Sequence, residues 1–251
     1  MKQPIVFSIM TKHWKKSDLF FWLQAIYYAQ SWRHLRQILS YRKSWQLSFN
    51  LGRNSVSDER PWLTLKAQEI ISSLIQPEYK VFEYGGGGST LFLCQRVQQV
   101  VTVEDHEEWF SRLKHTIKEK GFSNWDGLFI RPEERKDNAI KSHTLPSDFI
   151  SGAKGLQHLT YEKYARSIEA YPSGFFDLIL VDGRARPSCI QCALPYLKPG
   201  GLLVVDNTER QYYLQPFQDL IKREFEIILN DRYPTLYTPD FTITTILRRK
   251  F

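Results

Sequence analysis

Cysteine is scarce in this chain of 251 residues, which holds only Cys94, Cys189 and Cys192. Three cysteines cannot build a disulfide scaffold, and a chain of this length can bury a full core without one. Cys189 and Cys192 form a single CxxC motif, but they have no second pair to complete a zinc site and lie in a predicted helix. We therefore expect three small, buried apolar residues in a reducing, cytoplasmic environment.

Long apolar runs are also missing. The longest, residues 19–29, includes Gln24 and falls short of the ~20 residues that a transmembrane helix needs. The apolar stretch within residues 1–10 is too short and wrongly flanked for a secretory signal. Hydrophobic residues make up 42% and charged residues 24% of the chain. This composition excludes disorder, collagen and coiled coil for the bulk of the chain and indicates a globular protein.

The excess of positive charge is confined to the first sixty residues. The net charge is +7, and residues 1–60 hold ten basic and three acidic residues. Residues 61–251 hold 24 residues of each sign and are neutral. Because the larger part of the chain has no basic excess, we do not expect nucleic acid as a partner.

Residues 1–60 predict a basic, aromatic-rich helical extension or cap. Ser17 can cap a helix that opens at Asp18, and residues 19–39 carry apolar side chains nearly all round. Three interpretations stay open: a cap packed on the main domain, a membrane-surface helix, or a dimer contact. The lysines that flank Trp14 suit an anionic lipid surface, so peripheral membrane contact is one of the expectations. The oligomeric state is left open.

Residues 61–251 alternate between predicted strands and helices. The polar stretch 53–60 marks the boundary before them. We expect strands at 79–84, 100–104, 128–131, 176–181 and 202–205, helices at 64–75, 89–97, 106–120, 161–170, 188–197 and 215–225, and a final antiparallel hairpin of 226–229 with 242–247. Repeated strand–helix–strand units of this kind predict an α/β fold with a doubly wound, mostly parallel, seven-stranded sheet. Residues 132–160 show little periodicity and predict a loop that could wall an acceptor site.

A glycine turn follows the first predicted strand. It reads Glu83-Tyr84-Gly85-Gly86-Gly87-Gly88-Ser89-Thr90. A dinucleotide motif would need glycine where Thr90 stands, and the lysine of a phosphate-binding loop is missing. The carboxylate of Glu83 would repel a pyrophosphate but could hold an ammonium group. The turn therefore favours a cationic, amine-bearing ligand.

The second predicted strand ends at Glu104, 21 residues after Glu83. An acid at this strand tip can accept hydrogen bonds from both hydroxyls of a ribose. The first strand–helix–strand unit thus predicts a nucleoside that carries an amine and no phosphate. S-adenosylmethionine fits that description.

On these motifs the chain resembles the class I S-adenosylmethionine-dependent methyltransferases over residues 61–251. The glycine turn, Glu104, the strand ending in Asp182-Gly183, the block 197–207 and the closing hairpin all match in order. The resemblance implies S-adenosylmethionine as cofactor and a Rossmann-like methyltransferase domain. It also implies these cofactor-binding residues: Glu83, Gly85, Gly86, Gly87, Ser89, Thr90, Glu104 and Asp105, with the turn at 131–134 beside the adenine.

Three polar residues end the fourth and fifth predicted strands: Asp182, Asp206 and Asn207. Oxygen ligands at neighbouring strand tips, ~5 Å apart, suit Mg²⁺. The trio resembles the metal site of the cation-dependent O-methyltransferases that act on catechols and caffeoyl thioesters. Arg184 and Arg186 would place positive charge beside such a metal, so they could instead pair with Asp182 or hold an acidic substrate. Both interpretations, with and without Mg²⁺, stay open.

A general base could assist transfer to a hydroxyl. Asp182 is the first candidate and His106 the second, while His143 and His158 lie in the 132–160 loop. We predict an O-methyltransferase that acts on a hydroxyl of a small molecule or glycan by in-line transfer. The alternative is a non-catalytic protein of the same fold that serves as a partner or as an assembly unit at a membrane surface.

Overall fold

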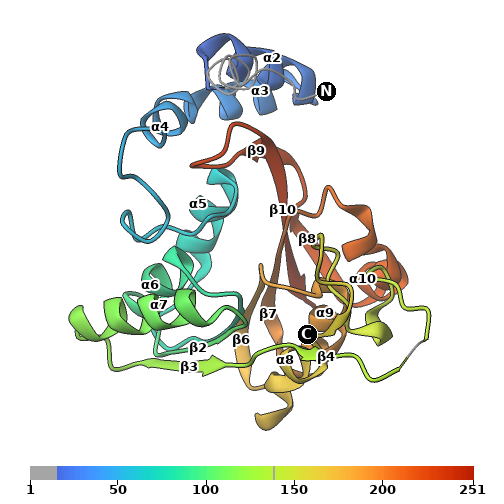
Figure 1. The fold of residues 1–251 in the computed structure, drawn as a ribbon. Coiled ribbons are helices and arrows are strands. Elements are labelled where there is room, and N and C mark those ends of the chain that lie inside the picture. Colours follow the sequence, from blue (N-terminus) through green and yellow to red (C-terminus); the bar gives the residue numbers. More distant parts are fainter. Residues whose placement is uncertain (1–15, 138) are drawn as a thin grey trace, which may run out of the picture.

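The computed structural model describes residues 16–137 and 139–251. Part of the membrane hypothesis rests on residues that lie outside the described ones, namely Lys12, Trp14 and Lys15. A central sheet organises the rest (Figure 1). Its order is β3-β2-β1-β6-β7-β10-β8, with a short strand β9 paired to β10. The predicted mostly parallel sheet with closing antiparallel strands is confirmed, and β9 gives it eight strands rather than the predicted seven.

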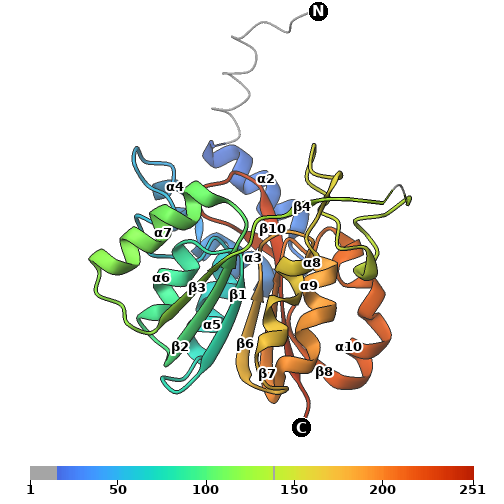
Figure 2. The same ribbon diagram turned by 60° about the horizontal axis from the view of Figure 1, so that its bottom comes forward.

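Five neighbouring strands of this sheet are parallel, and Figure 2 shows them side by side. They are β1 (Lys80–Tyr84), β2 (Gln99–Glu104), β3 (Trp125–Phe129), β6 (Phe176–Val181) and β7 (Leu197–Asp206). The strand order reverses between β1 and β6, so their carboxyl ends open a crevice where ligands bind in such folds.

The final strands run β8 (Phe225–Leu229), β9 (Arg232–Pro234) and β10 (Phe241–Arg249), and β10 is antiparallel to β7, β8 and β9. Two short strands, β4 (Glu133–Glu134) and β5 (Leu159–Thr160), form a separate antiparallel pair. This pair joins the two ends of the 132–160 loop, which also holds the 3-10 turn η1 (Pro146–Asp148).

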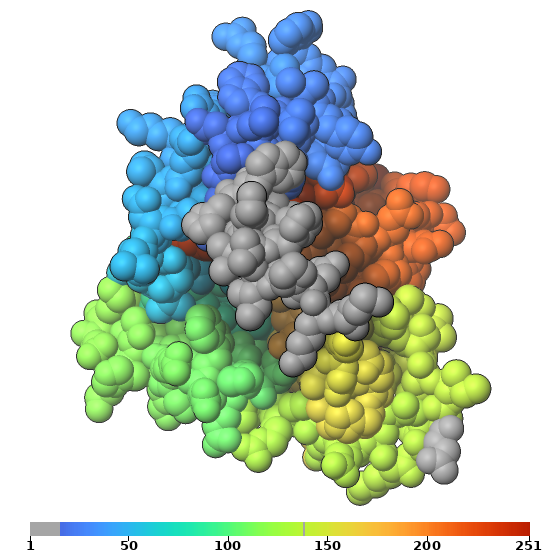
Figure 3. Space-filling model, turned by 45° about the horizontal axis from the view of Figure 1, so that its top comes forward, coloured from blue at the N-terminus to red at the C-terminus, as the bar shows by residue number. Residues whose placement is uncertain are grey.

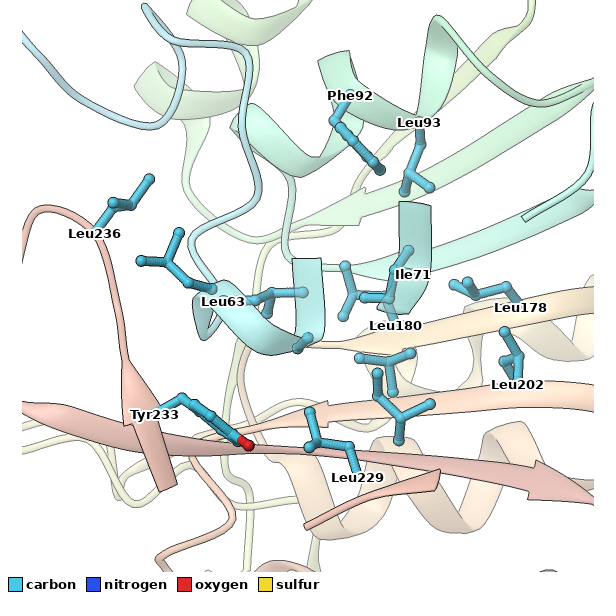
Figure 4. Packing of buried hydrophobic residues seen from close by; sticks show 14 of the residues in the cluster. Leu63, Ile71, Phe92, Leu93, Leu178, Leu180, Leu202, Leu229, Tyr233 and Leu236 are labelled. Carbon is cyan, nitrogen blue, oxygen red and sulfur yellow. The ribbon is translucent and has the colours of Figure 1, made fainter. Parts of the chain in front are cut away.

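Helices cover both faces of the sheet (Figure 1). The helices α5 (Leu65–Leu74), α6 (Gly88–Cys94) and α7 (Glu107–Glu119) lie on one face, and α8 (Glu162–Arg166), α9 (Arg186–Ala193) and α10 (Gln218–Glu224) on the other. Successive strand residues alternate between the two cores, so Val81 faces the first and Phe82 the second. Figure 4 shows the first core, in which Ile71 of α5 packs over Leu180 and Leu202.

Several boundaries differ from the predicted ones. Strand β3 begins three residues early, at Trp125, because this edge strand is only partly buried and its alternation is weak. Strand β7 includes the Lys198–Gly201 segment, with a register irregularity against β6. Predicted helices 161–170, 188–197 and 215–225 are shorter α-helices flanked by the 3-10 turns η2 (Ser167–Ala170), η3 (Leu194–Tyr196) and η5 (Gln215–Phe217). A further turn, η4 (Gln211–Tyr213), follows β7.

The described part of the extension forms three helices, α2 (Asp18–Tyr28), α3 (Trp32–Ser40) and α4 (Arg42–Leu47). Ser17 caps α2 by accepting a hydrogen bond from the Phe20 backbone. Phe21 is fully buried, and its ring lies 5.1 Å from Phe241 and 5.0 Å from Trp45 between ring centroids. The extension thus shares the first core with β10, and its blue surface meets the orange-red carboxyl-terminal part in Figure 3.

The buried cysteines agree with the expected apolar role, since all three are free thiols inside the protein. Burial raises the pKa of Cys189 and Cys192 on α9. No helix among residues 16–137 and 139–251 has the length and apolar character that crossing a membrane requires.

The contact of Phe21 with Phe241 predicts a stability effect. We expect Phe21→Ala to lower the free energy of unfolding by about 3–5 kcal/mol, because it removes a buried ring at the junction of α2 and β10. Trp32→Ala removes an aromatic side chain that is 80% exposed and should change stability by less than ~0.5 kcal/mol. Urea denaturation of both variants measures the difference, and equal losses would contradict it.

Candidate functional site

The glycine turn lies where the strand order reverses. Gly85 has φ 87°, and a Cβ there would lie 2.8 Å from the Cα of Gly183, at the end of β6. Only glycine meets both demands, the left-handed backbone and the close approach of two strand ends. Gly88 is constrained from the other side, since a Cβ would lie 2.1 Å from the carbonyl oxygen of Ser55. The boundary loop before Pro61 therefore packs directly on the start of α6.

Glu83 holds this turn from behind. Its buried carboxylate accepts hydrogen bonds from the hydroxyls of Ser89, Thr90 and Thr102, and Thr90 in turn accepts one from the Gly87 backbone at 2.9 Å. Burial raises the pKa of Glu83 to about 7, although the three hydroxyls favour the charged form. The side chain points into the α6 face of the sheet rather than into the crevice.

Glu104 closes the other side of the crevice. One carboxylate oxygen accepts from the Gly86 backbone at 3.0 Å, and the other accepts from Asp105 at 2.9 Å and His106 at 3.0 Å. Burial raises the pKa of Glu104, and the three backbone donors oppose that shift. Because the oxygen that accepts from Gly86 has no second donor, it keeps a lone pair, and Glu104 can still accept a hydrogen bond from a ligand hydroxyl.

A cavity of about 450 Å³ lies between these elements. The predicted residues that line it are Gly85, Gly86, Glu104, Asp105, His106 and Asp182. Gly87, Ser89, Thr90 and Glu83 do not line it, so they would act on a ligand through the turn that they hold. We refer to this space as the cofactor cavity.

Four lining residues escaped the sequence analysis: Trp62, Glu108, Trp109 and Arg112. Trp109 donates from its indole nitrogen to the Gly86 carbonyl at 2.7 Å and so braces the turn. The sequence carried a signal that could have identified Trp109. His106 caps α7, so Trp109 lies in the first turn of that helix, at the carboxyl edge of the sheet.

The predicted metal ligands do come together, but an arginine lies among them. The Arg186 guanidinium donates to Asp182 Oδ1 at 2.8 Å and to Asn207 Oδ1 at 3.1 Å, and it also donates to the backbone carbonyls of Asp182 and Asp206. The carboxylate of Asp206 accepts a hydrogen bond from the Thr244 hydroxyl at 2.6 Å. Each predicted ligand thus already has a partner within the protein.

These contacts favour the metal-free interpretation over the possible Mg²⁺ site at Asp182, Asp206 and Asn207. The guanidinium supplies the positive charge at this edge, and a divalent cation beside it would be repelled. No cluster of three or more His, Cys, Asp or Glu side chains that could hold a metal occurs in the part of the chain that the structure describes. The alternative, in which Arg186 pairs with Asp182, is what the structure shows.

Burial also changes how the two aspartates titrate. It raises the pKa of Asp182, which Arg186 opposes and Glu83 and Glu104 reinforce. It raises the pKa of Asp206 as well, with a further contribution from the charge of Asp182. Asp182 lines the cofactor cavity and Asp206 does not, so Asp182 is the aspartate that can meet a substrate.

A second cavity of about 340 Å³ adjoins the first and shares Gly183, Arg184 and Arg186 with it. We refer to it as the acceptor cavity. His143 reaches it from the 132–160 loop, which confirms that this loop walls a space beside the cofactor cavity. His158 is exposed and does not line either cavity. Tyr212 and Tyr213, which follow β7, complete the wall.

The raised pKa of Glu83 predicts a pH dependence of stability. Its pKa in the folded protein is about 7 against an ordinary value of 4.5. The folded state thus favours protonated Glu83. The contribution of this group to the free energy of unfolding falls by about 3 kcal/mol as pH rises from about 4.5 to about 7. We expect Glu83→Gln to remove that part of the decline in unfolding free energy between pH 5 and 8.

Glu78→Gln is the matched control, because Glu78 is exposed just before β1. Chemical denaturation at a series of pH values checks the prediction. If Glu83→Gln and wild type lose the same stability over this range, the buried carboxylate is not the cause.

No protein-family model matches this sequence, and no curated protein matches it either. Solved structures do match. An O-methyltransferase described as putative, from Klebsiella pneumoniae, is 14% identical with a TM-score of 0.56, over 86% of this chain and 99% of that chain. The O-methyltransferase from Bacillus cereus in complex with SAH is 16% identical with a TM-score of 0.52, over 86% of this chain and 90% of that chain.

An rRNA methylase from Streptococcus thermophilus is 15% identical with a TM-score of 0.50, over 74% of this chain and 95% of that chain. At identities this low, it is the TM-scores and coverages that show a shared fold, and they show the fold alone. With the strand order β3-β2-β1-β6-β7-β10-β8, the chain has the Rossmann-like fold of the class I S-adenosylmethionine-dependent methyltransferases.

Proposed function

We propose that this protein is an S-adenosylmethionine-dependent methyltransferase that acts on a hydroxyl of a small molecule or glycan. The observation that carries the proposal is the cofactor cavity at the reversal of strand order, where three glycines and four carboxylates meet. The similarity to an O-methyltransferase described in complex with SAH supports the choice of cofactor.

The residues of the cofactor cavity suit a cationic nucleoside. Glu104 has a lone pair left for a ribose hydroxyl, and the carboxylates of Asp105 and Asp182 favour the positive charge of an ammonium or sulfonium group. Gly85 and Gly86 let the backbone approach a ligand closely. When bound, S-adenosylmethionine supplies an activated methyl group on a sulfonium.

Asp182 is the best-placed general base. Burial raises its pKa, so its carboxylate is a stronger base than an ordinary aspartate, and Arg186 fixes its position. When the bound cofactor gives up its methyl group to an acceptor hydroxyl, Asp182 would accept the proton that the hydroxyl loses. His106 also lines the cavity, but its Nδ1 accepts a hydrogen bond as the cap of α7.

The role proposed for Glu104 is tested by binding. We expect Glu104→Gln to weaken the binding of S-adenosylhomocysteine by about tenfold to a hundredfold, because a charged acceptor of a ribose hydroxyl is lost. Glu107→Gln changes an exposed neighbour and should leave the affinity within about twofold. Isothermal titration calorimetry measures both, and circular dichroism confirms folding. Wild-type protein that fails to bind S-adenosylhomocysteine would overturn the proposal.

A second candidate role rests on the outer face of α2. Leu19, Trp22, Leu23 and Ile26 repeat at helical spacing and are exposed, opposite the buried Phe21 and Ala25. The extension also carries exposed Arg33, Arg36 and Lys43. An apolar helix face beside basic residues suits an anionic membrane surface. We propose peripheral attachment through this face, in addition to catalysis.

Vesicle flotation of the full chain tests attachment. We expect binding to vesicles that contain phosphatidylserine, and a reduction of about tenfold when Leu23 and Ile26 are both changed to serine, because two inserted apolar side chains are lost. Leu51→Ser is the control, since Leu51 is fully exposed outside α2. If the double variant floats as well as the control, the α2 face is not the contact.

A further inference from the structure

The two adjoining cavities differ in charge. Four carboxylates and three arginines line the cofactor cavity, whereas three arginines and no carboxylate are among the residues lining the acceptor cavity. The arginines are Arg184, Arg186 and Arg210. The boundary between the cavities is formed by Gly183, Arg184 and Arg186, next to Asp182. A molecule in the acceptor cavity therefore meets positive charge on one side and the proposed base on the other.

The three arginines differ in how many of their hydrogen-bond donors are already used within the protein. Arg186 is buried, and its donors are used by the ends of β6 and β7. Arg184 has one distant carboxylate, Asp105, at 3.6 Å, and its side chain is 42% exposed. Arg210 donates to the Tyr213 hydroxyl at 2.8 Å and has no acidic partner among the described residues. Arg184 and Arg210 thus keep donors for a ligand.

Part of the wall of the acceptor cavity is aromatic. The rings of His143 and Tyr212 meet edge to face with centroids 4.9 Å apart, and Tyr212 contacts Tyr213 at 4.7 Å. A Cβ on Gly152 would lie 2.9 Å from the His143 ring, so the loop backbone packs tightly behind it. A planar or sugar ring can lie against such a wall, while its anionic group faces the arginines.

We infer that the acceptor cavity binds an anionic methyl acceptor, a small molecule or sugar whose carboxylate or phosphate is held by Arg184 and Arg210. This inference rests on the proposed methyltransferase function and names its substrate class. The planar guanidinium fork binds either anion through two parallel hydrogen bonds. With the anion held there, the acceptor hydroxyl lies toward the boundary with the cofactor cavity, where Asp182 stands.

Matched pairs of probes test the inference. Calorimetry on the full chain, with and without S-adenosylhomocysteine, compares glucuronate with glucose, 4-hydroxybenzoate with 4-hydroxybenzamide, and inorganic phosphate alone. In at least one pair we expect the anionic member to bind about tenfold more tightly than its neutral partner. Whichever of phosphate and the carboxylate probes binds more tightly is the preferred anion.

Substitutions of Arg184 and Arg210 test whether these residues bind the anion. Arg210→Gln and Arg184→Gln should each weaken the anionic probes by about tenfold and the neutral probes by less than about twofold. Arg210→Gln should also leave S-adenosylhomocysteine binding within about twofold, because Arg210 does not line the cofactor cavity. Arg223→Gln removes an exposed arginine on α10 and serves as the control.

The outcomes separate the two proposals. If S-adenosylhomocysteine binds but anionic and neutral probes bind equally, or the arginine variants bind anions like wild type, the inference is overturned and the methyltransferase function stands. If S-adenosylhomocysteine does not bind, the methyltransferase function fails. Arginine-dependent anion binding would then describe an anion site that is not an acceptor site, which also overturns the inference.

Discussion

The guanidinium of Arg186 is the contact on which the site depends. It lies at the carboxyl ends of β6 and β7 and donates to side chains or carbonyls of Asp182, Asp206 and Asn207. A buried cation of this kind is costly unless its donors are satisfied, and here the two strand ends supply the acceptors. The same contact fixes Asp182 at the cofactor cavity and forms part of the boundary with the acceptor cavity.

The charge of the lining residues differs across that boundary. Carboxylates line the cavity at the glycine turn together with arginines, whereas the cavity beside the 132–160 loop is lined by arginines without a carboxylate. Over distances shorter than the Debye length, salt screens these charges only weakly. The arrangement favours a cation and an anion in adjacent positions, which suits the proposed pairing of a sulfonium cofactor with an acidic acceptor.

Much of the fold could be predicted from the sequence because its signals are local. The strand Phe176–Val181 is continuously apolar and was placed without error, whereas the edge strand Trp125–Phe129 was displaced because partial burial weakens its pattern. The glycine turn was recognised because it needs residues of one kind at consecutive positions.

The site was harder to predict because it depends on side-chain direction. Side chains alternate between the two faces of β1, so Glu83 lies on the same face as Val81, under α6. Applying this alternation to the sequence would have predicted that Glu83 points under α6 and away from the crevice. The choice between a metal and Arg186 at Asp182 could not be made from residue types alone. A metal ion and the Arg186 guanidinium would both bind the same oxygen atoms. The path of α9, which begins at Arg186, decides which of the two cations reaches them.

The contact of Phe21 with Phe241 joins the first described helix to the last strand of the sheet. During synthesis on the ribosome, α2 emerges some two hundred residues before its partner strand exists. Trp45 of α4 can cover part of its inner face early, but the side of Phe21 that meets Phe241 has no partner strand until β10 leaves the exit tunnel. Nascent chains are therefore expected to expose an aromatic helix for most of translation, which makes α2 a natural binding segment for a chaperone.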